Sequence, residues 1–550
     1  MTESALPPLA EQILRFLYET DPVNATGLGI HDYDYHYADF SPEKRAEILK
    51  QKKAFLQELK ALEESHLSSE DQVDLSILQS QLSTQIYEEE VRENLKRDPS
   101  LYPTEALYGV QQLQINYNLP LDHRVLAIIG RLKAMPRLFE QGMANLRSNP
   151  SKISKVSISV ARDSVMAGRQ FLEEIVPQFS GTVPHYFKDL LESNTQALKA
   201  LHHYQKFLDE LEPQAQDSLA CGKEHFDFLL RNKYQLDYHL DEVLEIGREA
   251  LKETERLIAE VAQELNPGKT WREQVEELKN KHPEADNLLQ AYKAEAERIR
   301  DFVVSENLVT LPETETLALM DTPIFQRSIM PYSGYVSPAA FEDHQTGYFW
   351  VTPVQDSLSD EDKHKHLRSH NIYDVTLTTV HHGYPGQHLL FVQTHQHPSR
   401  VRNSFPDPFL ASGWPLYCEE MLYTEGLYTD LNTRLFQLKD QLWRDYRVII
   451  DTQLHLGQMD YETAVQTLVE KVGLDPASAE AEVKRYALFP TIAIGYMFGK
   501  REIIRMRQEI AELKGDDFSL LKFHNNLLSF GMLPLSQLRR LMLTHYGLEA

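Results

Sequence analysis

Histidine is concentrated in one stretch of this 550-residue chain, where eight of its 22 histidines fall between residues 364 and 397. Imidazole is a common ligand of transition metals and also transfers protons near neutral pH, so the stretch predicts either a metal site or acid–base chemistry. Its central part, residues 379–388, reads Thr-Val-His-His-Gly-Tyr-Pro-Gly-Gln-His. The eight histidines are His364, His366, His370, His381, His382, His388, His395 and His397.

The spacing within residues 379–388 differs from that of a zinc-binding helix. In the His-Glu-x-x-His pattern, two histidines four residues apart share one helical face, and the Glu between them polarises metal-bound water. Here Pro385 stands four residues after His381, and Pro385 with Gly386 would interrupt a helix. His381 and His388 can therefore bind one ion only across a kink or an unwound turn. The alternative is that these histidines cap helices or face solvent.

Long amphipathic helices are expected to position these residues. Over residues 9–299 apolar residues recur at spacings of three and four, with breaks where Pro, Gly or Asn cluster. Over residues 308–353 short β-prone runs separated by Pro and Gly predict a small antiparallel sheet, after which the helical pattern returns. We expect a mainly α, large multi-helix fold. An N-terminal helical scaffold would span residues 1–300, and residues 301–550 would contain the sheet and the motif helices.

The composition disfavours several classes of partner and location. Lysine and arginine number 56 against 82 aspartates and glutamates, and a net charge of −26 repels nucleic acids and anionic lipids. Two cysteines, Cys221 and Cys418, are too few for a disulfide framework or a thiolate zinc cluster. No segment is apolar enough to span a membrane, and the acidic segment 1–17 is unlike a secretory signal. We therefore expect a cytoplasmic protein.

Two motifs in the second half resemble the signatures of a bacterial family, domain of unknown function 885. Members carry His-Glu-Ala-Tyr-Pro-Gly-His-His and, further along the chain, Glu-Gly-Trp-Ala-Leu-Tyr-Ala-Glu. The counterparts here are residues 381–388 and residues 412–419, which read Ser-Gly-Trp-Pro-Leu-Tyr-Cys-Glu. The chain is identified as a member by this resemblance, which other landmarks extend in the family's order: residues 25–31, Ser41-Pro42, residues 447–452, Leu454-His455, Arg485-Tyr486 and residues 490–500.

The resemblance implies a mostly helical, metallopeptidase-like fold that binds zinc. The implied ligands are the first histidine of the first motif, a second histidine at its end, and the leading glutamate of the second motif. This chain departs at three positions: His382 stands where the general-base glutamate should be, Gln387 replaces the first of the paired histidines, and Ser412 replaces the ligand glutamate. A serine hydroxyl is a poorer ligand than a carboxylate, and loss of a general base costs ~10²–10⁴ in rate. We therefore expect weakened zinc binding and altered chemistry.

The first functional hypothesis is a metallopeptidase-like hydrolase with a divergent metal site. Zinc or another divalent metal would be bound by His381, His388 and Glu419, the last of which lies seven residues after Ser412 and so on the same helical face. The substrate would be a peptide or an amide-type small molecule. This hypothesis is narrowly favoured over two others, which need no metal.

The other hypotheses involve Arg485, Tyr486 and Tyr496. Arginine and tyrosine donate hydrogen bonds to a developing oxyanion or to a substrate carboxylate. Together with His382, which can accept a proton, they would suit a metal-independent acid–base enzyme. Alternatively, Arg485 forms only a structural ion pair with a carboxylate such as Asp451, and the protein is a pseudoenzyme that binds peptides or another protein.

Overall fold

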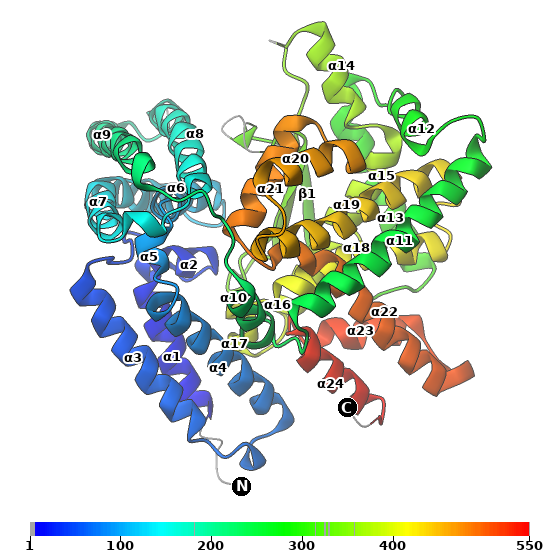
Figure 1. Ribbon diagram of the computed structural model, residues 1–550, viewed down its shortest axis with the longest axis horizontal. Helices are drawn as coiled ribbons and strands as arrows, with labels where there is room; N and C mark the ends of the chain where they lie inside the picture. The colour runs from blue at the N-terminus through cyan, green and yellow to red at the C-terminus, as the bar shows by residue number, and fades with distance from the viewer. Residues whose placement is uncertain are drawn as a thin grey trace. The chain divides into compact units, whose positions relative to one another are not determined.

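The computed structural model describes residues 6–548 except 181, 314, 324, 325, 328, 329 and 357, and it is mainly helical with one small sheet, as expected (Figure 1). The chain forms two compact units, each of which is described by itself. Unit 1 comprises residues 1–220 with residues 339–344, and unit 2 comprises the remainder. The division expected at residue 300 falls inside unit 2 and stays a prediction.

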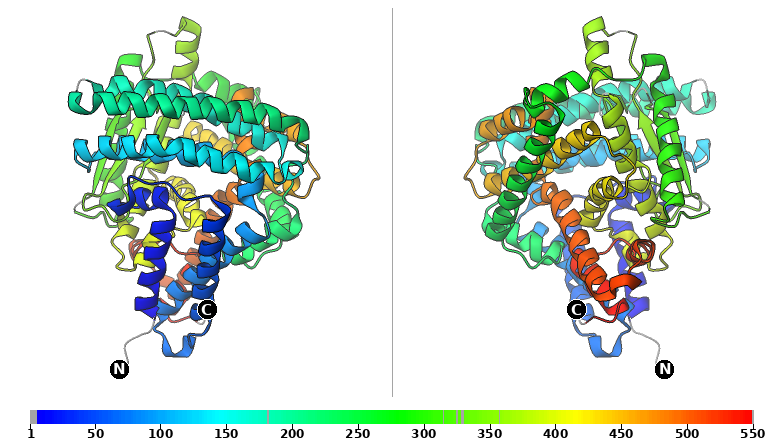
Figure 2. Two further views of the ribbon diagram at one scale, coloured as in Figure 1. Left: turned by 90° about the vertical axis from the view of Figure 1, so that its left-hand side faces the viewer. Right: turned by 90° about the vertical axis from the view of Figure 1, so that its right-hand side faces the viewer.

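Unit 1 is a layered arrangement of amphipathic helices. Its long helices α7 and α9 pack along each other, as the left view of Figure 2 shows in cyan and blue-green. Because their apolar faces meet, side chains such as Leu132 and Leu201 are almost completely buried. The helices of this unit are α1 (Leu6–Thr20), α2 (Pro22–Gly27), α3 (Pro42–Lys60), α4 (Ser69–Glu90), α5 (Asn94–Arg97), α6 (Leu101–Ile115), α7 (Leu121–Arg147), α8 (Lys155–Ser180) and α9 (Phe187–Leu211).

Unit 2 contains the sheet and both motifs. Its helices α11 and α19 pack along each other, and α18 packs on α22 (Figure 1). The elements are α10 (Lys223–Phe228), α11 (Leu240–Leu265), α12 (Trp271–Leu278), α13 (Leu288–Ser305), β1 (Thr316–Asp321), β2 (Ser333–Val336), β3 (Thr346–Val351), α14 (Asp360–Arg368), α15 (Ile372–His382), α16 (Gln387–His395), α17 (Arg400–Ser404), α18 (Pro408–Thr424), α19 (Leu431–His455), α20 (Tyr461–Thr467), α21 (Pro476–Leu488), α22 (Gly495–Lys514), α23 (Leu520–Ser529) and α24 (Leu535–His545).

The sheet is mixed, so the expected all-antiparallel arrangement is wrong for one strand pair. The strand order is β1-β3-β2, with β3 antiparallel to β2 but parallel to β1. Thr316 pairs with Thr346 at one end of the parallel ladder, and Asp321 pairs with Val351 at the other. Residues 308–311, which were expected to be β-prone, form no strand.

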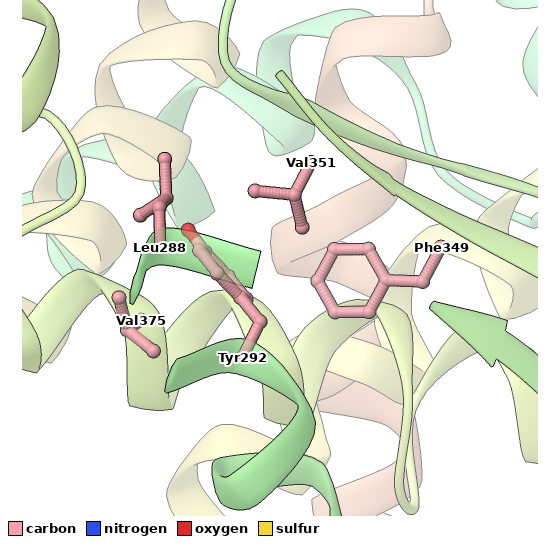
Figure 3. Packing of buried hydrophobic residues seen from close by; sticks show 5 residues of the cluster. All are labelled: Leu288, Tyr292, Phe349, Val351 and Val375. Atoms are coloured by element: carbon pink, nitrogen blue, oxygen red, sulfur yellow. The ribbon is translucent and has the colours of Figure 1, made fainter. Parts of the chain in front are cut away.

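A buried apolar cluster attaches the sheet to the motif helix α15. Phe349 and Val351 of β3 pack against Leu288 and Tyr292 of α13 and against Val375 of α15 (Figure 3). All five side chains are almost completely removed from water. This cluster fixes α15, and with it His381, relative to the sheet.

The crossing of α18 and α22 depends on two glycines. A Cβ atom on Gly413 would collide with the backbone of Gly499, and one on Gly499 would collide with the carbonyl oxygen of Phe409. The helices therefore approach backbone to backbone, which only glycine permits at these two positions. Asp407 fixes the start of α18 by accepting hydrogen bonds from the N–H groups of Phe409 and Leu410, each at 2.9 Å.

Candidate functional site

The first motif is divided by a non-helical turn, as its Pro-Gly pair predicts. Helix α15 ends at His382, and α16 begins at Gln387. The indole N–H of Trp414, in the second motif, donates a 2.7 Å hydrogen bond to the carbonyl oxygen of Pro385. A Cβ atom on Gly386 would collide with backbone carbonyl oxygens of α15, so only glycine fits there. The turn thus joins the two motifs and orients the flanking histidines.

His381 and Glu419 are brought together as a buried pair. His381 Nδ1 and Glu419 Oε1 are 2.7 Å apart, and both residues are less than one-tenth exposed. Burial raises the pKa of Glu419 to about 8, and burial together with the nearby Arg444 lowers the pKa of His381 to about 3. Both shifts favour the neutral form of each side chain, in which the carboxylic acid of Glu419 donates a hydrogen bond to the imidazole of His381. The other oxygen, Oε2, is buried without a hydrogen-bond partner.

Two of the three divergent positions contact each other. His382 Nδ1 and Gln387 Oε1 are 2.7 Å apart across the turn. The ring of His382 also lies edge-on to Phe349 of β3, with 5.4 Å between ring centroids. Burial and the neighbouring His381 lower the pKa of His382 to about 3, so its imidazole is neutral at physiological pH. A neutral His382 donates a hydrogen bond to the amide oxygen of Gln387, so the two residues that depart from the family pattern are complementary to each other.

His388 is directed away from the His381–Glu419 pair. Its Nε2 lies 2.8 Å from Glu315 Oε2, and its Nδ1 lies 3.1 Å from the hydroxyl oxygen of Tyr335. Tyr384 also donates to Glu315 Oε2, at 2.6 Å. Burial by itself would raise the pKa of Glu315, but the hydrogen bonds from His388 and Tyr384 lower it below its ordinary value. His388 is therefore part of a satisfied ionic and hydrogen-bonded cluster.

The residues present do not form the three-ligand zinc site that the resemblance implies. Of the predicted ligands, His381 and Glu419 converge, whereas His388 is bound by Glu315. No group of three or more His, Cys, Asp or Glu side chains is arranged to hold an ion within the part of the chain that the structure describes. Zinc binding stays a prediction, which the titration in the Discussion tests.

The remaining predicted site residues form a cationic and aromatic cluster. The ring of Tyr496 stacks on His381 with 6.2 Å between centroids. Arg447 lies over the same ring, with its Cζ 4.9 Å from the centroid, and donates from Nε to the hydroxyl of Tyr486 at 3.1 Å. Burial would raise the pKa of Tyr496, but Arg447, Arg485 and Arg444 lower it, which reports a positive potential at this ring.

Glu482 neutralises part of this charge. Its Oε2 accepts hydrogen bonds from Arg447 at 3.0 Å, from Arg485 at 2.7 Å and from Tyr486 at 2.7 Å. Although burial opposes it, Arg447 and Arg485 lower the pKa of Glu482 to about 2. The carboxylate partner of Arg485 is thus Glu482, three residues away on α21, and not the suggested Asp451. Arg485 and Tyr486 orient the cluster, while Tyr496 lies next to His381.

Four of the side chains that shape this region were not predicted as site residues from the sequence. Glu315 lies in the loop before β1, and a single acidic residue in a loop does not indicate a functional site. Trp443, Arg444 and Arg447 lie on α19, and the spacing of 443 and 447 places those two on one helical face. That spacing is equally typical of a solvated face, and Arg447 was noted only as part of the family landmark at residues 447–452.

The neutrality of the His381–Glu419 pair can be tested by two substitutions at one position. We expect Glu419→Gln to reduce the free energy of unfolding by less than about 1 kcal/mol, because the amide is neutral and still donates to His381 Nδ1. Glu419→Ala leaves that nitrogen without a donor and creates a cavity, so it should cost about 2–3 kcal/mol. Chemical denaturation measures both values. A cost of about 3–5 kcal/mol for Glu419→Gln would instead indicate an ion pair.

Comparison with known proteins places the chain in a family. Residues 22–542 match the family described as bacterial protein of unknown function (DUF885). The chain belongs to this family. No curated protein matches the sequence.

Two solved structures share the fold of this DUF885 protein. One, described as a putative lipoprotein of unknown function from Shewanella oneidensis, is 22% identical with a TM-score of 0.82, and the match covers 98% of this chain and 100% of the other. The second, from Colwellia psychrerythraea and also described as a lipoprotein, is 17% identical with a TM-score of 0.84, and the match covers 98% of both chains. At these identities the likeness establishes the fold alone.

These comparisons contradict the expected cytoplasmic location. Both structural neighbours are described as putative lipoproteins, a class of protein anchored at a membrane by an attached lipid. The expectation depended on an acidic N-terminal segment and on few cysteines, and neither feature determines the compartment of a protein. Among the described helices, none combines the length and the apolar character that crossing a membrane requires.

Proposed function

We propose that this chain binds a peptide or an amide-type small molecule in a metallopeptidase-like fold, without hydrolysing it by zinc chemistry. The observation that carries the proposal is the pairing of the predicted metal ligands with other protein groups. His381 is bonded to Glu419, and His388 is bonded to Glu315 and Tyr335. Burial raises the pKa of Glu419, so a divalent ion would have to displace its proton, and Ser412 supplies no negative charge in place of the lost glutamate.

The groups next to this pair support ligand binding. Tyr496 and Arg485 are partly exposed, and the Tyr496 hydroxyl has no hydrogen-bond partner among the described residues. Arg444 and Arg447 lie over the Tyr496 ring, and one buried N–H group of each has no hydrogen-bond partner among the described residues. Such an arrangement of aromatic surface with oriented donors is typical of sites that bind polar small molecules.

A metal-independent hydrolase is the second candidate. The observation that favours it is the stacking of Tyr496 on His381, which is itself held by Glu419. A carboxyl-oriented imidazole beside a tyrosine hydroxyl is an arrangement that can transfer protons. Zinc-dependent hydrolysis has less support, because the described residues do not assemble its ligand set.

Retention of peptides by the intact chain tests the proposal. The protein is dialysed against a defined mixture of short peptides, and the retained material is analysed by mass spectrometry. We expect intact peptides to be retained, and His381→Ala to weaken retention at least tenfold by removing the ring on which Tyr496 stacks. His364→Ala, the same change at an exposed histidine, is the matched control.

Four outcomes of this experiment have distinct meanings. Retention of intact peptides that depends on His381 supports a binding protein. Cleaved peptides that form in the presence of a chelator support the second candidate, whereas cleavage that the chelator abolishes supports the zinc hydrolase. Absence of both retention and cleavage overturns the proposal.

A further inference from the structure

Helix α19 presents three buried hydrogen-bond donors that have no acceptor. They are the indole Nε1 of Trp443, Nε of Arg444 and Nη1 of Arg447, and each is covered from solvent with no hydrogen-bond partner in the part of the chain that the structure describes. Arg447 as a whole is 4% exposed. More than nine in ten buried polar groups in proteins are hydrogen-bonded, so three unsatisfied donors on five consecutive helical positions call for an acceptor.

The three donors belong to one cluster. The Cζ atom of Arg447 lies 4.2 Å from the ring centroid of Trp443, and that of Arg444 lies 5.0 Å from it. Both guanidinium groups also lie over Tyr496, at 4.9 and 5.8 Å. Two guanidinium groups are therefore stacked about the same two rings, which orients their N–H groups and lowers the entropy lost when a ligand binds.

The nearby carboxylates bind other donors of the same side chains. Among the described residues, Asp440 lies within ion-pair distance of Lys439 and Arg444, and Glu482 pairs with Arg447 and Arg485. Arg444 donates a 3.0 Å hydrogen bond from Nη1 to the carbonyl oxygen of Asp440, and Arg447 donates a 3.0 Å hydrogen bond from Nη2 to Glu482. The donors that lack acceptors are thus the ones that these carboxylates do not reach.

From these observations we propose that Trp443, Arg444 and Arg447 bind a carboxylate of the ligand, in a subsite beside Tyr496. This inference rests on the proposed function and specifies its ligand as peptide-like and acidic. A carboxylate has two oxygens and accepts several hydrogen bonds, which matches two guanidinium groups and one indole N–H. Its negative charge also complements the two guanidinium groups. Partly exposed Tyr496 and Arg485 give the ligand an approach from solvent.

Nuclear magnetic resonance of the tryptophan indole groups tests this subsite in the full chain. The chain has four tryptophans, so ¹⁵N labelling of tryptophan gives four indole signals, and Trp443→Phe assigns the relevant one. The probe is N-acetylalaninate, and its matched control is N-acetylalaninamide, which lacks the charge. We expect a saturable shift of the Trp443 signal with N-acetylalaninate, and at least tenfold weaker binding of the amide. The indole of Trp414, already bonded to Pro385, should not move.

Substitutions and a third probe complete the test. Arg447→Gln should weaken binding of N-acetylalaninate at least tenfold. If that variant does not fold, Arg444→Gln should have the same effect. The control is Arg501→Gln, at an exposed arginine of α22, which should leave the affinity unchanged. The α-amide of N-acetylglutamate separates a side-chain carboxylate from a terminal one, and binding of either supports the subsite. Equal binding of acid and amide, or no shift with any carboxylate probe, overturns it. Peptides retained regardless of their carboxylates would overturn this inference alone and leave the proposed function standing.

Discussion

Reverting the three divergent positions, with His382→Glu, Gln387→His and Ser412→Glu, should raise the affinity for zinc at least about a hundredfold. The reversion adds two ligands and restores the carboxylate base at the family's spacing. Complete structural zinc sites bind with roughly 10–16 kcal/mol, or about 3 kcal/mol per ligand, so two added ligands support a gain of this size. His382 and Gln387 are hydrogen-bonded to each other, so both must change together.

The structure also indicates which histidine should bind the ion. Gln387 contacts His382, which follows His381 in the chain, whereas His388 is bound by Glu315 and Tyr335. We therefore expect the histidine introduced at position 387 to act as the ligand. Adding His388→Gln to the triple variant should leave its zinc affinity within a few-fold.

Calorimetric titration of zinc into the wild type, the triple variant and Ser412→Glu alone decides the matter. The single substitution serves as the control for an added charge. Equal or weaker binding by the triple variant would mean that these positions do not converge on one ion, and the ligand assignment taken from the family would then be wrong. A loss of affinity on adding His388→Gln would assign the ligand role to His388.

Features that depend on neighbouring residues could be predicted from the sequence. Pro385 and Gly386 divide the first motif because each disrupts a helix through its own backbone, and the break lies where it was expected. The strands at residues 316–321 and 346–351 follow their β-prone composition in the same way. The direction of β1 could not be predicted, because it depends on how residues 322–345 connect the strands.

Features that depend on distant residues could not be predicted. Glu315 and His388 are 73 positions apart in the sequence, and no local pattern indicates that the loop before β1 supplies the partner of His388. The cluster on α19 consists of residues close together in the sequence, but their burial depends on distant residues. Trp443, Arg444 and Arg447 read as a solvated helical face, and only the packing of Tyr496 against them shows that they are covered.

Glu315→Ala should reduce the free energy of unfolding by about 3 kcal/mol. The carboxylate accepts from both His388, which is fully buried, and Tyr384, so its removal leaves two donors without an acceptor. Each unsatisfied buried donor costs about 1–3 kcal/mol. Glu313→Ala, the same change of charge at an exposed position two residues earlier, should alter stability by less than about 0.5 kcal/mol.

The pH dependence of this effect follows from the lowered pKa of Glu315. Its hydrogen bonds from His388 and Tyr384 bring the pKa below the ordinary value of 4.5, so the folded state binds this proton less readily than the unfolded state. The stability that Glu315 contributes is therefore present above about pH 4.5 and is lost as the pH falls through the lowered pKa. Denaturation of the wild type and Glu315→Ala across this range should show their difference shrinking on acidification. A difference that stays constant, or one that Glu313→Ala reproduces, would mean that the carboxylate of Glu315 does not hold His388 in place.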